Sequence, residues 1–386
     1  MFGEFSETTR IPELSPPTRL ALLVPALFGG GAERLMSQLA TRWNSQGFEV
    51  HLVTWAATST DHYSIPDAVI RHGLGMLAPS RGWWSGMVAN WQRVKRLRET
   101  LQGIQPQLVV SFCDQMNIVA LEACWDRFPV LIAEHSNPER QRLRFPWEWW
   151  RSLRYPGCQA CVALSAEIAD YMSRWMDRSQ LVVIPPAIDP PQLAQVTGAV
   201  AKESHRLLFV GRLSHEKGVD ILIEAWRRVT HELPAWTLRV VGDGTEKESL
   251  MAQAREMQSV EFSGWQTDPW AAYRSADLFV LPSRYEGFPV ALMEALSQGL
   301  TCVATNCTSA LAVLDRQQRC VRIVPVEDVE ALANALVSAC KQIESHPDLI
   351  HRQGQCRELV KDFTWEQVGK DWDMLLSRTL NATRKR

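Results

Sequence analysis

The chain has 386 residues, of which 46% are hydrophobic and 22% are charged, and its formal net charge is −2. This composition is ordinary for a globular protein and argues against a disordered scaffold, while the length predicts two or three domains. The near-neutral charge argues against bulk nucleic-acid binding. Tryptophan is abundant, with 16 residues against 5 tyrosines. Such rings are either buried or placed at apolar boundaries such as membrane interfaces.

The N-terminus and the cysteines bear on localisation. Residues 1–17 are polar and contain three prolines, which predicts a flexible leader and no signal peptide. The nine cysteines are scattered and odd in number, unlike a secreted disulfide framework. Cys158 and Cys161 lack a second pair at zinc-site spacing, so we expect buried thiols and no metal. The sequence predicts a cytoplasmic protein.

In residues 18–190, short apolar runs alternate with amphipathic helical patterns such as 32–44 and 87–101, which is typical of a parallel α/β sheet. The expected strands are 20–25, 50–55, 108–112, 130–133, 160–164 and 181–184.

A proline-rich stretch over 185–205 is a credible linker, and a second α/β series fills 206–362. Its expected strands are 207–210, 238–241, 260–262, 278–281, 302–304 and 321–324. A closing helix within 363–386 carries an apolar stripe and is expected to pack back on the first domain. The fold class is therefore two doubly wound, Rossmann-like α/β domains facing a central cleft.

Two glycine-containing loops follow predicted strands. The loop Gly29–Gly31 precedes a helix whose N-terminus favours anions, but a tight turn without a ligand remains an alternative. The loop 211–218 presents Arg212 and Lys217, each beside a glycine. A guanidinium and an ammonium together suit a diphosphate, although two solvated loop charges would show the same pattern.

The loop 282–294 carries the most specific pattern. Pro289 suits the first turn of a helix, so that free amides near Phe288 and Val290 would face an anion. Glu286 precedes this helix and Glu294 lies more than one turn inside it. One carboxylate can then reach a reacting sugar, while the other accepts hydrogen bonds from vicinal hydroxyls such as those of ribose. A solvated acidic helix start is the alternative.

Together these loops resemble retaining glycosyltransferases of family 4, which have the GT-B fold. The resemblance spans nearly the whole chain and rests chiefly on E-x7-E (Glu286 to Glu294) and on Gly-Arg-x4-Lys-Gly at 211–218. It implies that Arg212 and Lys217 neutralise the donor diphosphate, that Glu294 holds the ribose and that Glu286 lies by the transferred sugar. The implied donor contacts also include Gly30, Gly31, Gly287, Phe288, Pro289 and Val290.

The resemblance also implies that His135, after the strand 130–133, contacts the transferred sugar; a structural histidine is the alternative. The cationic loop can replace a divalent metal, so we expect no metal and no cofactor. The expected donor substrate is a nucleotide sugar, namely a UDP-sugar. The segment 306–311 departs from the family, which has a glycine-containing turn there. That departure puts the donor contacts of this loop in doubt.

Two segments mix arginine with tryptophan, at 81–98 and 140–154. Basic faces with tryptophan are typical of helices in a membrane interface, and arginine stems lying over buried rings are the alternative. We expect docking on an anionic membrane, on the inner face of the cytoplasmic membrane.

The leading hypothesis is a retaining, metal-independent transferase. It would move a hexose or N-acetylhexosamine to a glycan or polyprenyl-diphosphate-linked acceptor in cell-surface polysaccharide or glycoconjugate assembly. The alternatives are a sugar-nucleotide 2-epimerase and a non-catalytic glycosyltransferase-like binding protein.

Overall fold

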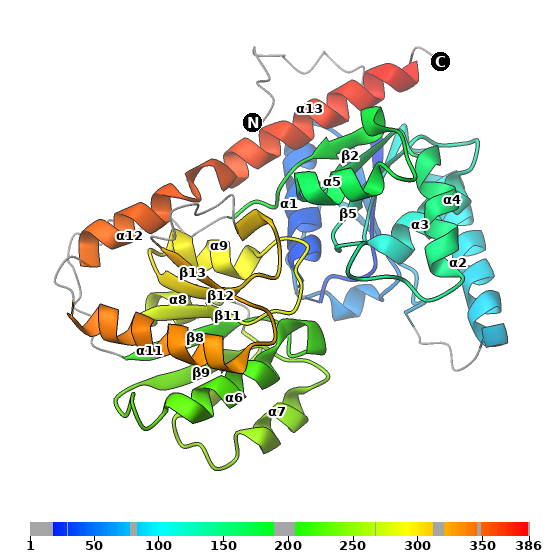
Figure 1. The fold of residues 1–386 in the computed structure, drawn as a ribbon. Helices are drawn as coiled ribbons and strands as arrows, with labels where there is room; N and C mark the ends of the chain where they lie inside the picture. Colours follow the sequence, from blue (N-terminus) through cyan, green and yellow to red (C-terminus); the bar gives the residue numbers. More distant parts are fainter. Residues whose placement is uncertain are drawn as a thin grey trace. The chain divides into compact units, whose positions relative to one another are not determined.

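A computed structural model describes residues 18–28, 30–77, 83–188, 205–266, 268–311, 320–345 and 349–384 (Figure 1). The chain divides into two compact units. The first consists of Met1–Pro186 and Glu366–Arg386, and the second of Ala187–Trp365.

The described part of the first unit contains a seven-stranded sheet in the order β3-β2-β1-β4-β5-β6-β7, and every neighbouring pair is parallel. Its strands are β1 (Arg19–Val24), β2 (Glu49–Thr54), β3 (Ile70–Gly73), β4 (Leu108–Phe112), β5 (Val130–Glu134), β6 (Ala160–Ala163) and β7 (Leu181–Val183). The central strands are buried along their whole length, because helices cover both faces of such a sheet.

The helices of this unit are α1 (Gly31–Ser45), α2 (Trp83–Ile104), α3 (Asp114–Cys124), α4 (Trp147–Arg154), α5 (Ala166–Met172) and α13 (Trp365–Arg384), with the short 3₁₀ turns η1 (Thr58–Thr60), η2 (Tyr155–Gly157) and η3 (Arg178–Gln180). Helices α2, α3 and α4 lie side by side (Figure 1). On α13, the buried ring of Trp372 packs against Trp43 of α1 and Phe112 of β4, with centroids 6.4 and 5.4 Å away.

The second unit has a six-stranded parallel sheet, among the residues described, in the order β10-β9-β8-β11-β12-β13. Its strands are β8 (Arg206–Val210), β9 (Thr237–Val241), β10 (Val260–Gly264), β11 (Leu278–Leu281), β12 (Thr301–Thr305) and β13 (Val321–Val324). Its helices are α6 (Val219–Val229), α7 (Lys247–Gln253), α8 (Trp270–Arg274), α9 (Val290–Ser297), α11 (Val329–Ser345) and α12 (Leu349–Glu358), with η4 (His215–Lys217) and η5 (Lys361–Phe363).

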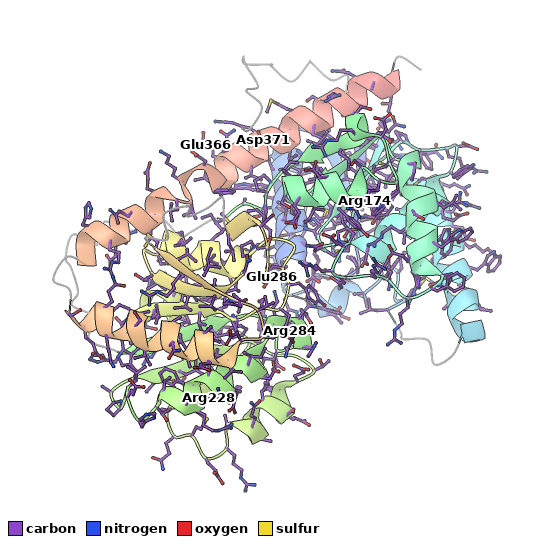
Figure 2. The ribbon with its side chains drawn as sticks, viewed as in Figure 1. Arg174, Arg228, Arg284, Glu286, Glu366 and Asp371 are labelled. Carbon is purple, nitrogen blue, oxygen red and sulfur yellow. The ribbon has the colours of Figure 1, made fainter. Side chains whose placement is uncertain are left out.

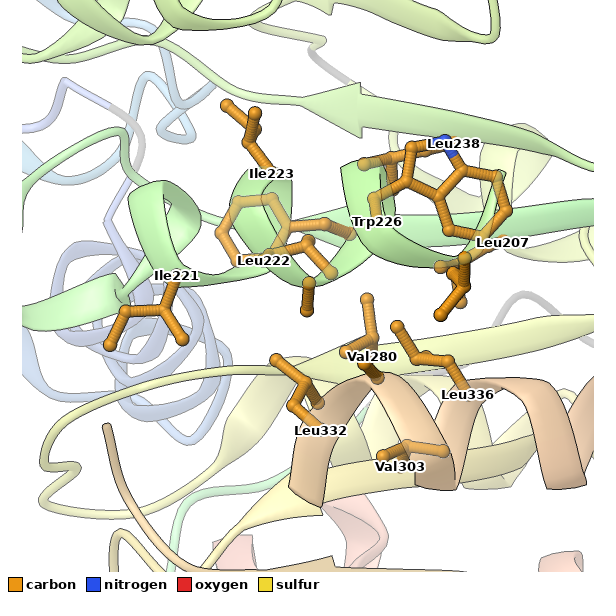
Figure 3. Packing of buried hydrophobic residues seen from close by; sticks show 14 of the residues in the cluster. Leu207, Ile221, Leu222, Ile223, Trp226, Leu238, Val280, Val303, Leu332 and Leu336 are labelled. Carbon is orange, nitrogen blue, oxygen red and sulfur yellow. The ribbon is translucent and has the colours of Figure 1, made fainter. Parts of the chain in front are cut away.

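An apolar cluster joins α6 and α11 to the sheet of the second unit (Figure 3). Leu222 and Trp226 of α6 and Leu336 of α11 are fully buried there, together with Leu207 of β8 and Val280 of β11. Side chains spaced three and four residues apart share one helical face, so α6 buries its apolar stripe against the sheet. This core holds the ends of β8 and β11, from which the two predicted donor loops emerge.

The expectation of two parallel α/β domains is confirmed. One strand was missed: β3 is a half-exposed edge strand in which Ile70 faces solvent, so no apolar run marked it. Three of the abundant tryptophans are packing residues, since Trp226, Trp236 and Trp372 are all buried. The central cleft stays a prediction.

Candidate nucleotide-sugar site

Lys217 and Glu286 meet in the second unit, although they are 69 residues apart in sequence. The ammonium Nζ of Lys217 donates to both carboxylate oxygens of Glu286 at 2.8 Å. The hydroxyl of Ser283 donates to Glu286 Oε1 at 2.7 Å. Glu286 is 8% exposed and Ser283 is fully buried. A buried carboxylate with two such donors is held in one orientation.

The sequence predicted both charges but not their ion pair, and it missed Ser283. A serine three residues before a glutamate was the available signal for that hydrogen bond.

The loops that carry these two residues are packed backbone to backbone. Gly218 has φ +63°, and a Cβ atom there would lie 2.2 Å from the carbonyl oxygen of Pro282. Only glycine allows both this conformation and this approach. The amide of Arg284 donates to the carbonyl oxygen of Glu216 at 2.8 Å. The loops after β8 and β11 therefore form one structural block, as expected for neighbouring strands of a parallel sheet.

Arg212 lies in the same loop as Lys217 and is exposed to solvent. It makes no side-chain hydrogen bond or ion pair with another described residue. Glu216 accepts a hydrogen bond from Ser214 Oγ at 2.5 Å. Burial raises the pKa of Glu216, but this hydrogen bond and the charges of Lys217 and Arg212 outweigh it, so that the net pKa is lowered. The loop thus keeps an accessible guanidinium.

Helix α9 begins one residue later than expected, because Pro289 lies just before its first turn. The amide of Val290 donates to the carbonyl oxygen of Phe288 at 2.9 Å, so the expectation of a free amide at Val290 is wrong. Glu294 is buried on α9, and its Oε2 accepts a hydrogen bond from the Tyr273 hydroxyl at 2.8 Å. Tyr273, on α8, was missed by the sequence reasoning. It orients the carboxylate for which a ribose contact is expected.

The unusual segment 306–311 supports the Glu286 turn. The carbonyl oxygen of Cys307 accepts the amide hydrogen of Glu286 at 3.2 Å. The hydroxyl of Thr305, at the end of β12, donates to the carbonyl oxygen of Ser283 at 2.5 Å. Burial raises the pKa of the Cys307 thiol to about 12, so this cysteine is a packing residue in its neutral form. The departure from the family pattern therefore preserves a backbone contact to the site loop.

The predicted N-terminal glycine loop is partly described, since Gly29 lies outside the described residues. The amide of Gly30 donates to Glu33 Oε2 at 3.1 Å. A Cβ atom added at Gly31 would meet nothing within 4 Å. One amide at the start of α1 is thus bonded to a carboxylate of the chain itself, a contact that competes with anion binding.

His135 follows β5 and packs its ring against Phe112, with centroids 4.5 Å apart. Its Nε2 is buried and has no hydrogen-bond partner among the described residues. Burial lowers the pKa of His135 to about 4, so the imidazole is neutral at physiological pH.

The preceding residue, Glu134, was missed by the sequence reasoning. It is fully buried, accepts hydrogen bonds from the Ser136 amide and hydroxyl at 3.0 and 2.7 Å, and accepts another from the Tyr155 hydroxyl at 2.7 Å. It therefore fixes the backbone that follows His135. A glutamate closing an apolar run was the signal that could have found it.

The two Arg/Trp segments are less uniformly basic at the surface than expected. Arg151 is completely buried, donating to Glu148 at 2.7 Å and lying 4.0 Å from Glu134. Arg154 pairs with Glu122 at 2.6 Å. In the other segment, Arg93 and Arg98 donate to backbone carbonyl oxygens, while Arg81 lies outside the described residues. Membrane docking through these segments therefore stays a prediction, and it depends on their exposed residues.

Within the described ranges, no three His, Cys, Asp or Glu side chains are grouped as metal ligands. The same ranges contain no helix long and apolar enough to cross a membrane.

Comparison with known proteins agrees with this geometry. The family described as Glycosyltransferase Family 4 matches residues 29–192, and the family described as Glycosyl transferases group 1 matches residues 204–342. A Campylobacter jejuni relative is 23% identical over 367 residues, covering 94% of this chain and 99% of its own length. Its name is GalNAc-alpha-(1->4)-GalNAc-alpha-(1->3)-diNAcBac-PP-undecaprenol alpha-1,4-N-acetyl-D-galactosaminyltransferase.

Two solved structures share the fold. Sucrose-phosphate synthase of Thermosynechococcus elongatus has a TM-score of 0.78 at 19% identity, covering 95% of this chain and all of its own. Anabaena HepE in complex with UDP-glucose has a TM-score of 0.73 at 17% identity, covering 93% of this chain and 99% of its own. The chain therefore belongs to the glycosyltransferases with the GT-B fold and is an enzyme, with a Glycosyltransferase Family 4 segment followed by a Glycosyl transferases group 1 segment.

Proposed function

We propose that this enzyme transfers a hexose or N-acetylhexosamine from a UDP-sugar, with retention of anomeric configuration and without a divalent metal. The observation that carries the proposal is the block formed by Lys217, Glu286 and Ser283, with Arg212 accessible beside it and Glu294 on the following helix. It provides cations for a diphosphate and two ordered carboxylates for sugar hydroxyls. The complex of HepE with UDP-glucose supports the choice of nucleotide.

In the proposed reaction, the bond between the anomeric carbon and the phosphate oxygen breaks, and the acceptor oxygen bonds to the same carbon on the same face. The acceptor's proton passes to the leaving phosphate oxygen, so the products are the glycoside and UDP. Negative charge develops on the diphosphate, where Lys217 and Arg212 stabilise it electrostatically. His135, neutral at working pH, would contact the transferred sugar as a hydrogen-bonding group.

The donor is tested with a panel of UDP-hexoses and UDP-N-acetylhexosamines, scored by UDP release with and without EDTA and by NMR of the product anomer. We expect release of UDP that EDTA does not reduce, and a product with the anomeric configuration of the donor. A new sugar nucleotide formed without acceptor would indicate a 2-epimerase. UDP binding without turnover would indicate a binding protein.

Glu286→Ala tests the site assignment. It should lower kcat at least about 100-fold, because an ordered carboxylate beside the sugar is lost. UDP binding should be retained or tightened, since Lys217 is released from its ion pair. Calorimetric titration with UDP separates these two effects, and unchanged kcat would refute the assignment.

We propose a polyprenyl-diphosphate-linked or other glycan acceptor at an anionic membrane surface, with the enzyme peripheral on the inner face of the cytoplasmic membrane. The support is an exposed apolar row at and along α4, at Phe145, Trp149 and Leu153, which are 78%, 60% and 50% exposed. Trp149 and Leu153 are four residues apart on α4 and share one helical face, and Phe145 lies two residues before the helix. Three exposed arginines precede them, at 140, 142 and 144. This combination suits an anionic bilayer.

Vesicle flotation tests the membrane proposal. We expect binding to phosphatidylglycerol-containing vesicles at low salt and little binding to phosphatidylcholine vesicles. The double variant Phe145→Ser/Trp149→Ser should lose the binding. Met251→Ser, at an exposed apolar residue of the second unit, should retain it. Equal flotation of both variants would overturn the proposal.

A further inference from the structure

The guanidinium of Arg284 joins three parts of the second unit. Its Nη1 and Nη2 donate to the two carboxylate oxygens of Asp220 at 2.9 and 2.7 Å. Nη1 also donates to the carbonyl oxygen of His215 at 2.6 Å, and Nε donates to Glu327 Oε1 at 2.8 Å. Four of the five guanidinium N–H groups are thus bonded, and the side chain is 13% exposed. Figure 2 labels Arg284 beside Glu286.

We propose that Arg284 is a positioning residue of the donor site, which holds the loop of Lys217 and the loop of Glu286 in their working arrangement. This inference rests on the proposed function and deepens it.

The contacts of Arg284 reach both functional side chains through very short stretches of chain. Glu286 is two residues from Arg284 in the same loop. His215 begins η4, the turn that ends with Lys217. Asp220 lies in the first turn of α6, directly after this loop. A planar, bidentate guanidinium fixes distance and angle together, which a lysine at this position would not do.

The charge of Arg284 favours the ionised form of its partner Asp220. Burial raises the pKa of Asp220, but the hydrogen bond and the charge of Arg284 outweigh it, so that the net pKa is lowered. Glu327, the third partner, has φ +60°, which is uncommon for a residue with a side chain. The salt bridge to Arg284 also connects the loop between β13 and α11 to the same guanidinium.

Enzyme kinetics with Arg284→Met give the first test. Misplacement of a cation and a carboxylate by a fraction of an ångström affects the transition state more than it affects ground-state binding of UDP. We expect kcat to fall about 30-fold or more, with the UDP dissociation constant changed less than about threefold. Arg284→Lys should recover part of the loss, and Asp220→Asn should lower kcat less than Arg284→Met does.

Arg228→Met is the matched control (Figure 2). Arg228 is an exposed arginine of α6, and its Nε lies 3.5 Å from Glu224 Oε1 in an exposed ion pair. The variant should leave kcat and UDP binding unchanged. A kcat of Arg284→Met within twofold of the wild-type value would overturn the inference. So would a loss that Arg228→Met reproduces.

Hydrogen–deuterium exchange gives a readout that needs no turnover. In Arg284→Met, the amides of Lys217, residue 284 and Glu286 should exchange faster. The first two are hydrogen-bonded within or between the joined loops, and the amide of Glu286 holds its loop to the carbonyl oxygen of Cys307. Amides of β9 should be unaffected. If the wild-type enzyme transfers no sugar, the proposed function fails while this measurement still decides the positioning role. Unchanged exchange at all three amides would overturn it.

Discussion

At the scale of single residues, His135 makes stability depend on pH. Its pKa is about 4 in the folded protein, against 6.5 for an ordinary histidine, because burial disfavours the charged ring. The unfolded chain therefore binds a proton that the folded chain does not, and stability falls as pH decreases from about 6.5 towards 4.

We expect His135 to cost the first unit about 1–2 kcal/mol between pH 7 and pH 5. The variant His135→Gln, which cannot titrate, should lose less stability over that interval. Urea unfolding at both pH values measures the difference. Identical pH dependence of the two proteins would show that the ring is accessible to protons in the folded state.

The residues found by sequence and those missed differ in a physical way. Lys217, Glu286 and Glu294 follow strand ends in recognisable spacings, so their place at one edge of a sheet could be predicted. Ser283, Tyr273 and Glu134 act through hydrogen bonds whose partners depend on tertiary packing. Tyr273 reaches Glu294 from another helix, 21 residues away, and no local pattern indicates such a contact.

At the scale of elements, Asp373 anchors α13 to α1. It accepts hydrogen bonds from Arg42 at 2.7 Å, Trp43 at 3.0 Å and Gln46 at 2.9 Å. Asp373 therefore anchors one helix to another and is not a solvated surface charge. Asp373→Ala should destabilise the first unit by about 2–4 kcal/mol, because the buried indole N–H of Trp43 and the half-buried guanidinium of Arg42 lose their partner.

Asp371 on the same helix is the matched control (Figure 2). Burial raises its pKa, so its carboxylate is less favourable in the folded than in the unfolded protein near neutral pH. Asp371→Asn should leave stability unchanged or raise it slightly. Chemical denaturation of both variants at pH 7 measures the contrast, and equal losses would contradict the anchoring role of Asp373.

The strand pattern shows why most elements could be predicted and β3 could not. Strands buried on both faces, such as β4 and β11, are continuous or nearly continuous apolar runs. β3 pairs with β2 on one side only, and its residues Ile70–Gly73 include an arginine and a histidine. An edge strand needs no apolar run, because one side of it is solvated.

At the scale of the whole molecule, the near-zero net charge conceals local asymmetry. The exposed arginines before α4 stand beside apolar rings, whereas Arg151 and Arg154 are neutralised by glutamates. A sequence count cannot separate these two groups, since only the fold shows which arginines have partners. The proposed membrane surface is therefore smaller and better defined than the two basic segments suggest.

The division into two units, each with its own sheet, predicts the response of unfolding to ligand. The proposed UDP contacts of Arg212, Lys217 and Glu294 all belong to the second unit. UDP at 100 times its dissociation constant should stabilise that unit by about 2.7 kcal/mol. Differential scanning calorimetry should show the transition of the second unit moving to higher temperature, with a smaller shift for the first.

Variants assign the two transitions and make the prediction decisive. Asp373→Ala should lower the first-unit transition while leaving the UDP-induced shift of the second intact. Lys217→Ala should abolish most of the UDP-induced shift, because the ammonium that binds the diphosphate is lost. A UDP-induced shift in Lys217→Ala equal to that of the wild type would show that UDP binds the second unit without Lys217, since mass action requires the stabilised unit to be the one that holds the ligand.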